Sequence, residues 1–467
     1  MPKHSHGRLA IQVRQLRKQQ QAAPAMPFSD LLDPQQVQQA IAQFGRHIRR
    51  CVLSPLQTFY AFLAQVFNAD PSCEEATDRL LAWQTAAGLP ACSGATGPYC
   101  KARARLPEAL PRHVAREVGQ RLHDRVAPGA LLRGRPIKIV DGSTASLPDT
   151  QANQQAYPQP RSQRRGVGFP ILRFVVVLGL RSGAALEAAL GPYLGKQTGE
   201  QALLRPLLDQ FTAGDVVLGD RYFCSYWQIA LLQQRGVDSL FRMHQRRKVD
   251  FRTGRRLGPQ DHVVRWTKPT QPPAWMDQEL YAALPAELAV RELKYRVGVP
   301  GFRVKLLVLA TTLVDAQLYP AGELAGAFRA RWHAELDLRS IKAALQMDVL
   351  RCKTPAMVRK EFWMHLLAYN LVRQKMAAAA ARSGRLPREL SFTGALHLLR
   401  SFAPLLALLP PDLVRAMDQL LLQVLARRVV GERPDRYEPR AVKRRPKPHR
   451  LLLEPRARAR QRMLRAA

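Results

Sequence analysis

The 467-residue sequence is short of acidic residues, of cysteine and of long hydrophobic runs. Its six cysteines have no CxxC spacing, so neither a structural zinc site nor a disulfide framework is indicated. The most apolar run, 169–180, contains Arg173 and is too short to cross a bilayer. The first residues are basic but lack the apolar core and cleavage site of a secretory signal. We therefore expect a protein of the reducing cytoplasm that neither spans a membrane nor is exported.

The shortage of acidic residues leaves a large excess of positive charge. Lys and Arg total 72 against 36 Asp and Glu, a formal net charge of +36. A high-GC genome alone would favour Arg over Lys, but it would not produce an imbalance of this size. Such a chain repels itself unless a polyanion neutralises it, and nucleic acid is the leading candidate. We expect DNA as the partner, no small-molecule cofactor and a location on the nucleoid.

The length predicts two to four structural units, and the 46% of hydrophobic residues is enough for packed cores. Apolar residues at three- and four-residue spacings predict helices at both ends, and β-branched runs predict strands in the middle. We expect little regular structure in the Arg- and Pro-rich tail. The expected parts are a basic arm (1–27), a helical DNA-binding domain (28–130), the first part of a catalytic core (131–242), a β-rich insertion (243–313), the last part of the core (314–378), a helical region (379–430) and a basic tail (431–467).

The middle of the chain alternates between strand-like and helix-like segments. The pattern predicts strands at 136–143, 169–180, 185–193, 215–220 and 238–242, with helices at 199–211 and 225–236. Three strands followed by helix, strand, helix and strand are typical of a mixed α/β sheet with helices on its faces. The fold class is therefore α/β, with all-helical regions on either side.

Three acidic residues are candidates for one site. Asp141 and Asp220 each end a predicted strand, where side chains project into a crevice at the sheet edge. Glu335 lies on a predicted helix that is part of a longer one from 323 to 346, and Leu338, Ile341 and Leu345 form its packing face. Taken alone, Glu335 is better explained as part of a solvated stripe of ion pairs. Together, three carboxylates would make a hard oxygen site for Mg²⁺ or Mn²⁺.

Several sequence blocks carry a family resemblance. DGST at 141–144, GDRYF at 219–223 and the spacing Phe-x-x-Arg-x-x-x-Glu-x-x-x-x-x-x-Lys from residue 328 to 342 resemble the signatures of the bacterial insertion-sequence-4 family of DDE transposases. The resemblance covers the order of all blocks from 136 to 373, and the helical region around 97–107 is similar too. This chain has Phe328 where the family usually has Tyr, and Tyr222 where Gly or Ala is common.

The resemblance implies a ribonuclease-H-like core with a β-rich insertion between the second Asp and the Glu. It implies a transposase that binds terminal inverted repeats and catalyses strand cleavage and strand transfer, with a hairpin intermediate as one route. Asp141, Asp220 and Glu335 would be the catalytic residues and would hold two Mg²⁺ or Mn²⁺ ions. Pairing of two DNA ends implies at least a dimer on DNA.

Further residues are candidate DNA contacts. Arg331 and Lys342 are expected to hold phosphates, and Arg339 is either a helper or part of a surface ion pair. Trp266 would stack on an unpaired base, although a buried core tryptophan is the more common situation. The remaining candidates are Phe328 on the same helix and Arg164 and Arg165 in a loop that follows the Asp141 strand, which is otherwise a solvated surface loop.

Two alternatives to a transposase remain open at this stage. A ribonuclease-H-like nuclease would cleave DNA without joining ends. A catalytically idle DNA-binding protein would bind ends without nicking them, although an intact acidic triad argues against it.

Overall fold

The computed structural model describes residue 26 and residues 28–44, 53–126, 129–296, 306–407, 409–430 and 452–466. Nearly all of the expected basic arm and the first part of the basic tail lie outside these ranges. The chain divides into two compact units, one made of 1–119 with 360–430 and the other of 120–359 with 431–467. Each unit is described by itself.

The first unit is helical, as the spacing of its apolar residues predicts. Its helices are α2 (Pro34–Phe44), α3 (Pro55–Phe67), α4 (Cys73–Ala86), α5 (Thr96–Arg105), most of α6 (Ala109–Arg125), most of α13 (Pro355–Arg382), α14 (Phe392–Leu406) and α15 (Pro411–Ala426). Local signals fix where they begin: Ser54 and Gln57 form a capping box at α3, and the hydroxyl of Ser72 caps α4.

The core of this unit contains several buried charged residues, Arg103 among them. The guanidinium of Arg103 donates a 2.9 Å hydrogen bond to Gln65 Oε1 and lies 4.8 Å from the ring centroid of Tyr99. Because a buried charge is tolerated only when it is paired or hydrogen-bonded, these contacts let α5 pack against α3.

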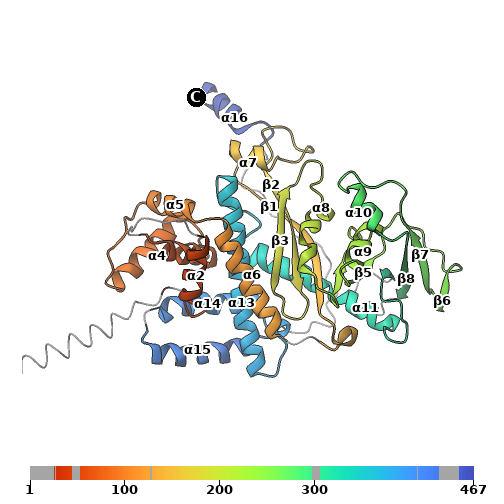
Figure 1. Ribbon diagram of the computed structural model, residues 1–467. Helices are drawn as coiled ribbons and strands as arrows, with labels where there is room; N and C mark the ends of the chain where they lie inside the picture. The colour runs from red at the N-terminus through yellow and green to blue at the C-terminus, as the bar shows by residue number, and fades with distance from the viewer. Residues whose placement is uncertain are drawn as a thin grey trace, which may run out of the picture. The chain divides into compact units, whose positions relative to one another are not determined.

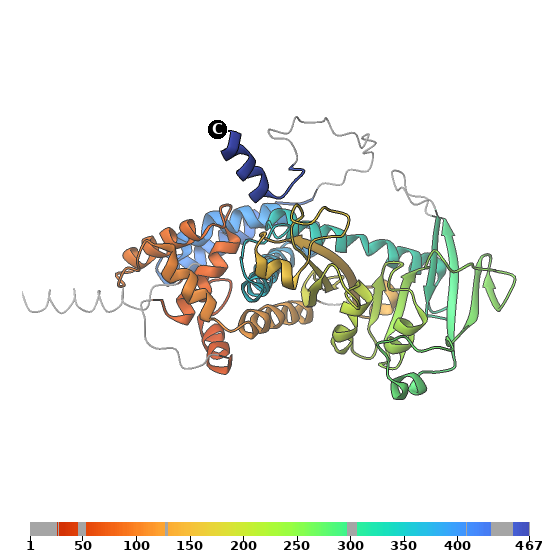
Figure 2. The ribbon, with the colours of Figure 1, turned by 90° about the horizontal axis from the view of Figure 1, so that it is seen from above.

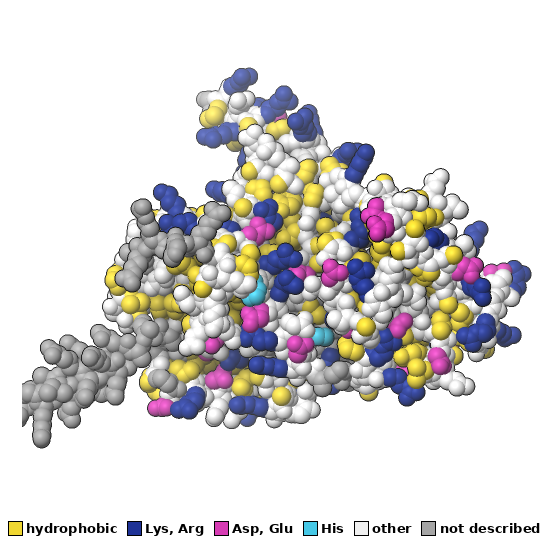
Figure 3. Space-filling view, in the orientation of Figure 1, with side chains coloured by type: hydrophobic (Ala, Val, Ile, Leu, Met, Phe, Trp, Pro, Cys, Tyr) yellow, Lys and Arg dark blue, Asp and Glu magenta, His cyan; other side chains and the backbone are white. Residues whose placement is uncertain are grey.

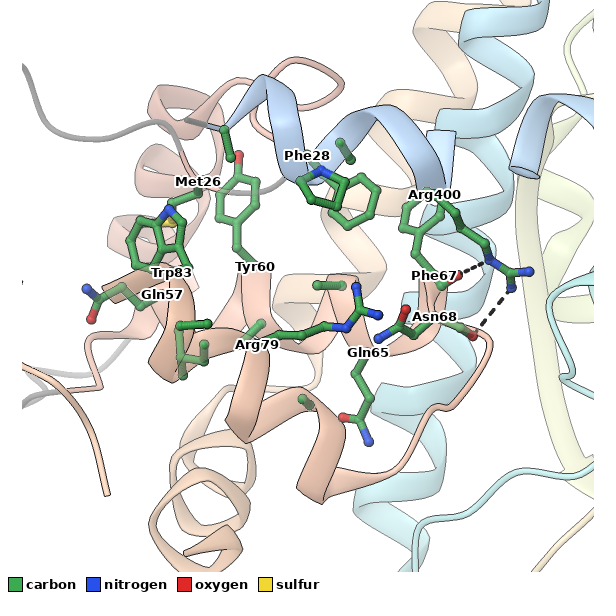
Figure 4. Close-up of a pocket in the computed structure, with 18 of the residues that line it drawn as sticks. Met26, Phe28, Gln57, Tyr60, Gln65, Phe67, Asn68, Arg79, Trp83 and Arg400 are labelled. Atoms are coloured by element: carbon green, nitrogen blue, oxygen red, sulfur yellow. Dashed lines mark hydrogen bonds between the residues drawn. The ribbon is translucent and has the colours of Figure 1, made fainter. Parts of the chain in front are cut away.

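Beside that core lies an apolar cavity of about 370 Å³. Figure 4 shows the aromatic side chains of Phe28, Tyr60, Phe67 and Trp83 around it. Arg400 lies at one end, where its guanidinium donates hydrogen bonds to the backbone oxygens of Phe67 and Asn68 (Figure 4). The packing of α3, α4 and α14 therefore leaves a hollow that these side chains do not fill.

The second unit is built on a nine-stranded sheet (Figure 1). The strand order is β3-β2-β1-β4-β5-β9-β8-β7-β6. The strands are β1 (Ile137–Ser146), β2 (Ile171–Gly179), β3 (Ala185–Pro192), β4 (Val216–Gly219), β5 (Asp238–Arg242), β6 (Arg255–Gly258), β7 (Asp261–Thr267), β8 (Glu287–Arg296) and β9 (Leu306–Thr311). In Figure 2 the sheet is seen from above, with the yellow strands at one end and the green strands at the other.

The first five strands form the expected ribonuclease-H-like core. β1, β2 and β3 pair antiparallel, and β1, β4 and β5 pair parallel, which gives the order β3-β2-β1-β4-β5. Right-handed parallel crossovers need connecting helices, and α9 (Tyr226–Gln233) supplies one between β4 and β5. The predicted α/β fold class is confirmed.

The segment predicted to be β-rich, 243–313, continues this sheet. It contains β6 to β9 and the short helix α10 (Gln278–Ala283). β9 pairs antiparallel with β5, so β6 to β8 extend the core sheet beyond its fifth strand. Buried residues on β8 and β9, such as Val290 and Leu309, join the apolar interior.

Helices cover the sheet and carry the residues that follow it. α8 (Glu200–Leu204) contacts β2 and β3, α9 and α11 (Ala321–Ala330) contact β5, and α12 (Trp332–Arg339) contacts β1. The remaining elements are the 3-10 turns at Leu131–Gly134, Arg205–Gln210 and Pro387–Glu389, helix α7 (Gln151–Ala156) and helix α16 (Arg456–Ala466). Helix α16 lies in the tail where we expected little regular structure, so that expectation is wrong for residues 456–466.

Candidate active site

Asp141 lies on β1, beside the point where two strands part. The parallel pairing of β1 with β4 ends at Ile139, opposite Leu218. The strand itself does not end near Asp141, as the sequence suggests, because antiparallel pairing with β2 continues to Ser146. Asp141 therefore projects from a rigid two-stranded ribbon into the space that opens beyond β4.

Asp220 follows directly after β4, as predicted. Its Oδ1 accepts a 2.8 Å hydrogen bond from the backbone N–H of Tyr222. This short Asx turn fixes the direction of the carboxylate at the end of a fully buried strand. Two neighbouring strands thus deliver one aspartate each to the same edge of the sheet.

Glu335 comes from the helical segment that packs on β1. The predicted long helix is interrupted at Arg331, between α11 and α12, and ends in a π-helical turn at Ser340–Ala344. The predicted packing face is confirmed, because Leu338, Ile341 and Leu345 are buried. Glu335 is on an adjacent, wetter side of the helix, with 43% of its side chain exposed.

The three carboxylates line one cleft together with the predicted cations. Its lining residues are Asp141, Gly142, Asp220, Arg331, Glu335, Leu338, Arg339, Lys342, Ala343 and Asp348. Arg331 forms ion pairs with both of its acidic neighbours, at 3.4 Å from Nη1 to Asp141 Oδ2 and 3.1 Å from Nη2 to Glu335 Oε1. Lys342 donates a 3.1 Å hydrogen bond from Nζ to Ser143 Oγ.

The electrostatics of the cleft centre on Asp141. The pKa of this carboxyl is raised to about 6, mainly by burial and also by the charges of Asp220 and Glu335, against the opposing effect of Arg331 and of the Gly142 backbone N–H. Only 15% of the Asp141 side chain is exposed, so little water compensates its charge. The cleft therefore favours a cation beside Asp141.

The three carboxylates are chemically suitable ligands for a divalent cation, although they are too far apart to coordinate one ion together. Carboxylate oxygens in a partly hydrated cleft are the ligands that Mg²⁺ and Mn²⁺ prefer. In the described part of the chain, no three His, Cys, Asp or Glu side chains are grouped closely enough to hold a metal ion. Arg331 is the group that bridges Asp141 and Glu335.

Other predicted DNA contacts lie elsewhere. Trp266 is only 2% exposed and donates a 2.7 Å hydrogen bond from Nε1 to Glu292 Oε1, while Arg247 covers its ring at 3.6 Å from the centroid. This position offers no ring face to a base, so its alternative interpretation as a core residue is correct. Phe328 is also buried and lies under Arg331, 5.9 Å from ring centroid to guanidinium.

The loop residues Arg164 and Arg165 are exposed and do not line the cleft. Arg164 Nη1 donates a hydrogen bond to the backbone oxygen of Leu453 at 3.3 Å. On the face seen in Figure 3, further Lys and Arg side chains gather over α16 and over the region of β6 and β7. Arg255 and Arg256 of β6 are exposed.

Sequence reasoning missed a second, cationic cleft. It is lined by Arg221, Arg242, Met243, His244, Gln245, Arg247, Val249, Phe251, Lys294, Leu306 and Val308. Burial lowers the pKa of Arg242, and the like charges of Arg221 and Arg331 lower it further. Arg242 ends β5, the strand next to β4 in the sheet. Side chains at strand ends project into a crevice at the sheet edge, so the position of Arg242 at the end of a predicted strand could have identified it.

Glu200 is the other residue that was missed. It is the first residue of α8, and its carboxyl lies against Gly142, directly after Asp141. No sequence signal identifies it, because a Glu in the first turn of a helix is ordinary and its approach to β1 exists only in the folded chain.

Comparison with known proteins places the segment that carries these residues in a described family. The family described as "Transposase DDE domain" matches residues 132–371. The chain is 28% identical over 433 residues to "Transposase InsG for insertion sequence element IS4" of Escherichia coli (strain K12), covering 89% of this chain and 93% of that one. Among solved structures, the piggyBac transposase synaptic complex with hairpin DNA has a TM-score of 0.41 and 11% identity, covering 85% of this chain and 83% of that one.

No helix among the described residues is long and apolar enough to cross a membrane.

DDE transposases cleave DNA by nucleotidyl transfer and generally use divalent metal ions. The family match spans more than half of the sequence, on the segment that carries the three-carboxylate cleft. The chain therefore belongs to the DDE transposases of the insertion-sequence-4 family.

Proposed function

We propose that the protein is the transposase of an insertion sequence, with Asp141, Asp220 and Glu335 as its catalytic carboxylates. One observation carries this proposal: three acidic residues from β1, from the end of β4 and from α12 line the same cleft. They are far apart along the chain, and the fold delivers each of them from a different element. A structural network of surface ion pairs needs no such convergence.

The three carboxylates would hold two Mg²⁺ or Mn²⁺ ions. When bound, such ions polarise the phosphodiester and support the attacking and leaving oxygens. Asp141 and Asp220 are fixed by the sheet, whereas Glu335 is on a wetter helix face and is held by Arg331. We propose that Arg331 leaves the carboxylates for a DNA phosphate, which frees Glu335 to turn toward the aspartates.

The cations of the cleft would then position DNA. Arg331 is suited to a bidentate contact with phosphate, and Lys342 and Arg339 line the same cleft. The second cleft, with Arg221 and Arg242, adds like charges that a phosphate backbone would neutralise. Arg164 and Arg165 would hold the backbone farther from the chemistry.

The reaction would consist of two in-line displacements at phosphorus. In the first, water attacks, the bond to the 3′ oxygen breaks, and a 3′-OH is left at the end of the element. In the second, that hydroxyl attacks another phosphodiester and takes the place of its leaving oxygen. Attack on the opposite strand would give a hairpin, and attack on target DNA would give insertion. Two ends are joined, so we propose a dimer on DNA that recognises the terminal inverted repeats.

The test is an assay of purified protein with Mg²⁺ and DNA fragments that carry the ends of the element. We expect nicked ends and joined products. Asp141→Asn, Asp220→Asn and Glu335→Gln should each lower cleavage by at least about a thousandfold, because each removes a ligand charge, while DNA binding is largely kept. Asp209→Asn is the matched control, since Asp209 is an exposed acid of the same unit that does not line the cleft.

Each alternative gives a different result. A nuclease would produce nicks and never joints, and an idle binding protein would retain DNA in a mobility shift without metal-dependent nicking. Normal nicking by the Glu335→Gln protein would show that the third carboxylate is assigned wrongly.

A further inference from the structure

A fourth carboxylate, that of Glu200, lies against Gly142 of β1, next to Asp141, without being one of the residues that line the cleft. Glu200 begins α8, which contacts β2 and β3. A Cβ atom built on Gly142 would lie 2.4 Å from Glu200 Cδ and 2.5 Å from Oε1. Contacts this short do not occur between real atoms, so the carboxyl occupies the space that any side chain at position 142 would need. The Gly that follows Asp141 is what admits Glu200.

The surroundings of Glu200 provide no counter-charge at its carboxyl. Within the described residues, its side chain has no hydrogen bond or ion pair. The charge of Arg173 acts favourably on the Glu200 carboxylate, but Arg173 Nη1 donates to the backbone oxygen of Thr198 at 2.9 Å and its guanidinium stacks on Tyr193 at 4.4 Å. Burial raises the pKa of Glu200, and the charges of Asp220 and Asp141 add to that effect. The carboxylates of Glu200, Asp141 and Asp220 thus repel one another.

A role in α8 alone does not explain this placement. An acidic residue in the first turn of a helix interacts favourably with the helix dipole, but α8 has only five residues and the effect is small. A side chain serving that purpose would also be free to point into water. Instead it is half-buried against the backbone of β1, beside a residue proposed to bind cations.

We propose that Glu200 belongs to the catalytic cleft as a positioning residue whose negative charge strengthens divalent-cation binding by Asp141 and Asp220. The proposal rests on the proposed function of those two aspartates. A negative charge several ångströms from a divalent ion attracts it even without contact, and a partly buried cleft screens this attraction less than water does. Glu200 thereby offsets the positive charge that Arg331, Arg339 and Lys342 bring to the cleft.

The experiment is a calorimetric titration of the full-length protein with Mn²⁺, without DNA. Glu200→Gln should weaken Mn²⁺ binding about tenfold, the order expected for one unit charge near a divalent ion in a hydrated cleft. Glu200→Asp keeps the charge and should recover most of the affinity. Asp209→Asn removes one exposed acid of the same unit and should leave the affinity unchanged.

Thermal unfolding of the metal-free protein separates this role from a structural one. Glu200→Gln should melt at the same temperature or higher, because it removes repulsion and leaves the packing against Gly142 in place. A merely structural glutamate would instead lower the melting temperature without a selective loss of Mn²⁺ affinity.

Wild-type Mn²⁺ affinity in Glu200→Gln would overturn the proposal for Glu200. Asp220→Asn separates this outcome from a failure of the proposed function. If Asp220 is a metal ligand, Asp220→Asn should lose Mn²⁺ binding whether or not Glu200 contributes. If Asp220→Asn binds Mn²⁺ and cleaves DNA like the wild type, the assignment of the cleft itself fails.

Discussion

Asp141 is held where ionisation is costly, and this makes its charge state a test of the site. Burial and two neighbouring acids raise the pKa of its carboxyl to about 6, from an ordinary value of 3.8. The unfolded chain therefore ionises this group at lower pH than the folded protein does. Folding stability must fall as pH rises from about 4 to about 6, because over this range the folded state binds more protons.

Ionisation of the folded Asp141 carboxyl should lower the free energy of unfolding of the metal-free protein by up to about 3 kcal/mol as the pH rises. This effect lowers the melting temperature at pH 7.5 relative to pH 4.5. Asp141→Asn removes the titrating group and should melt higher than the wild type at pH 7.5 in EDTA. Mg²⁺ should raise the wild-type melting temperature at pH 7.5 and not at pH 4.5. An equal pH dependence in Asp141→Asn and Asp209→Asn would contradict this assignment.

Single residues differ in how far the sequence reveals them. Asp141, Asp220 and Glu335 stand in recognisable blocks, and the structure brings all three to one cleft. The four-residue helical spacing of Arg331 and Glu335 predicts the ion pair between them. The ion pair of Arg331 with Asp141 is not predictable in this way, because Asp141 is distant in the sequence. Burial of Trp266 under Arg247 depends on strand pairing within the sheet, which local sequence does not specify.

At the scale of elements, strands and helices are predicted well where periodicity decides them. β2, β3, β4, β5 and α9 lie where the apolar patterns place them. The extension of β1 to Ser146 is different, because it comes from antiparallel pairing with β2 and not from local propensity. The interruption at Arg331 and the π-helical turn at Ser340–Ala344 are also not indicated by the apolar periodicity, which runs through both, and such turns often occur at functional sites.

The helical unit allows a test of packing through its apolar cavity. Ala403 of α14 lines the cavity, whereas Ala395 of the same helix is fully buried and does not. Ala403→Leu should stabilise the unit by about 1 kcal/mol, because it adds apolar contacts in an existing hollow. Ala395→Leu should destabilise it by about 1–3 kcal/mol through overpacking. The measurement is denaturant unfolding of the full chain, and equal losses in both variants would show that the hollow does not accept a side chain.

At the scale of the whole molecule, the alternation of strands and helices predicts a mixed α/β sheet, and the family resemblance implies the ribonuclease-H-like core that the first five strands form. The continuation of the sheet through β9, β8, β7 and β6 does not follow from the sequence, because the antiparallel pairing of β5 with β9 joins segments separated by the whole insertion. The excess of basic residues predicts a polyanionic partner but not its path over the surface. Two clefts that share the neighbourhood of Asp220 now suggest where that path runs.

A net charge of +36 makes the salt dependence of DNA binding the broadest test of this arrangement. Each neutralised phosphate releases condensed counterions, so the logarithm of the association constant should fall steeply and linearly with the logarithm of salt concentration. Arg331→Gln and Lys342→Gln should each lower that slope by about one, measured by fluorescence anisotropy with end-bearing DNA. Arg235→Gln is the matched control, because Arg235 pairs with Asp209 away from both clefts. Binding that does not depend on salt would contradict a phosphate path through the cleft, whereas a lower slope in the cleft variants alone would place the DNA backbone beside Asp141 and Glu335.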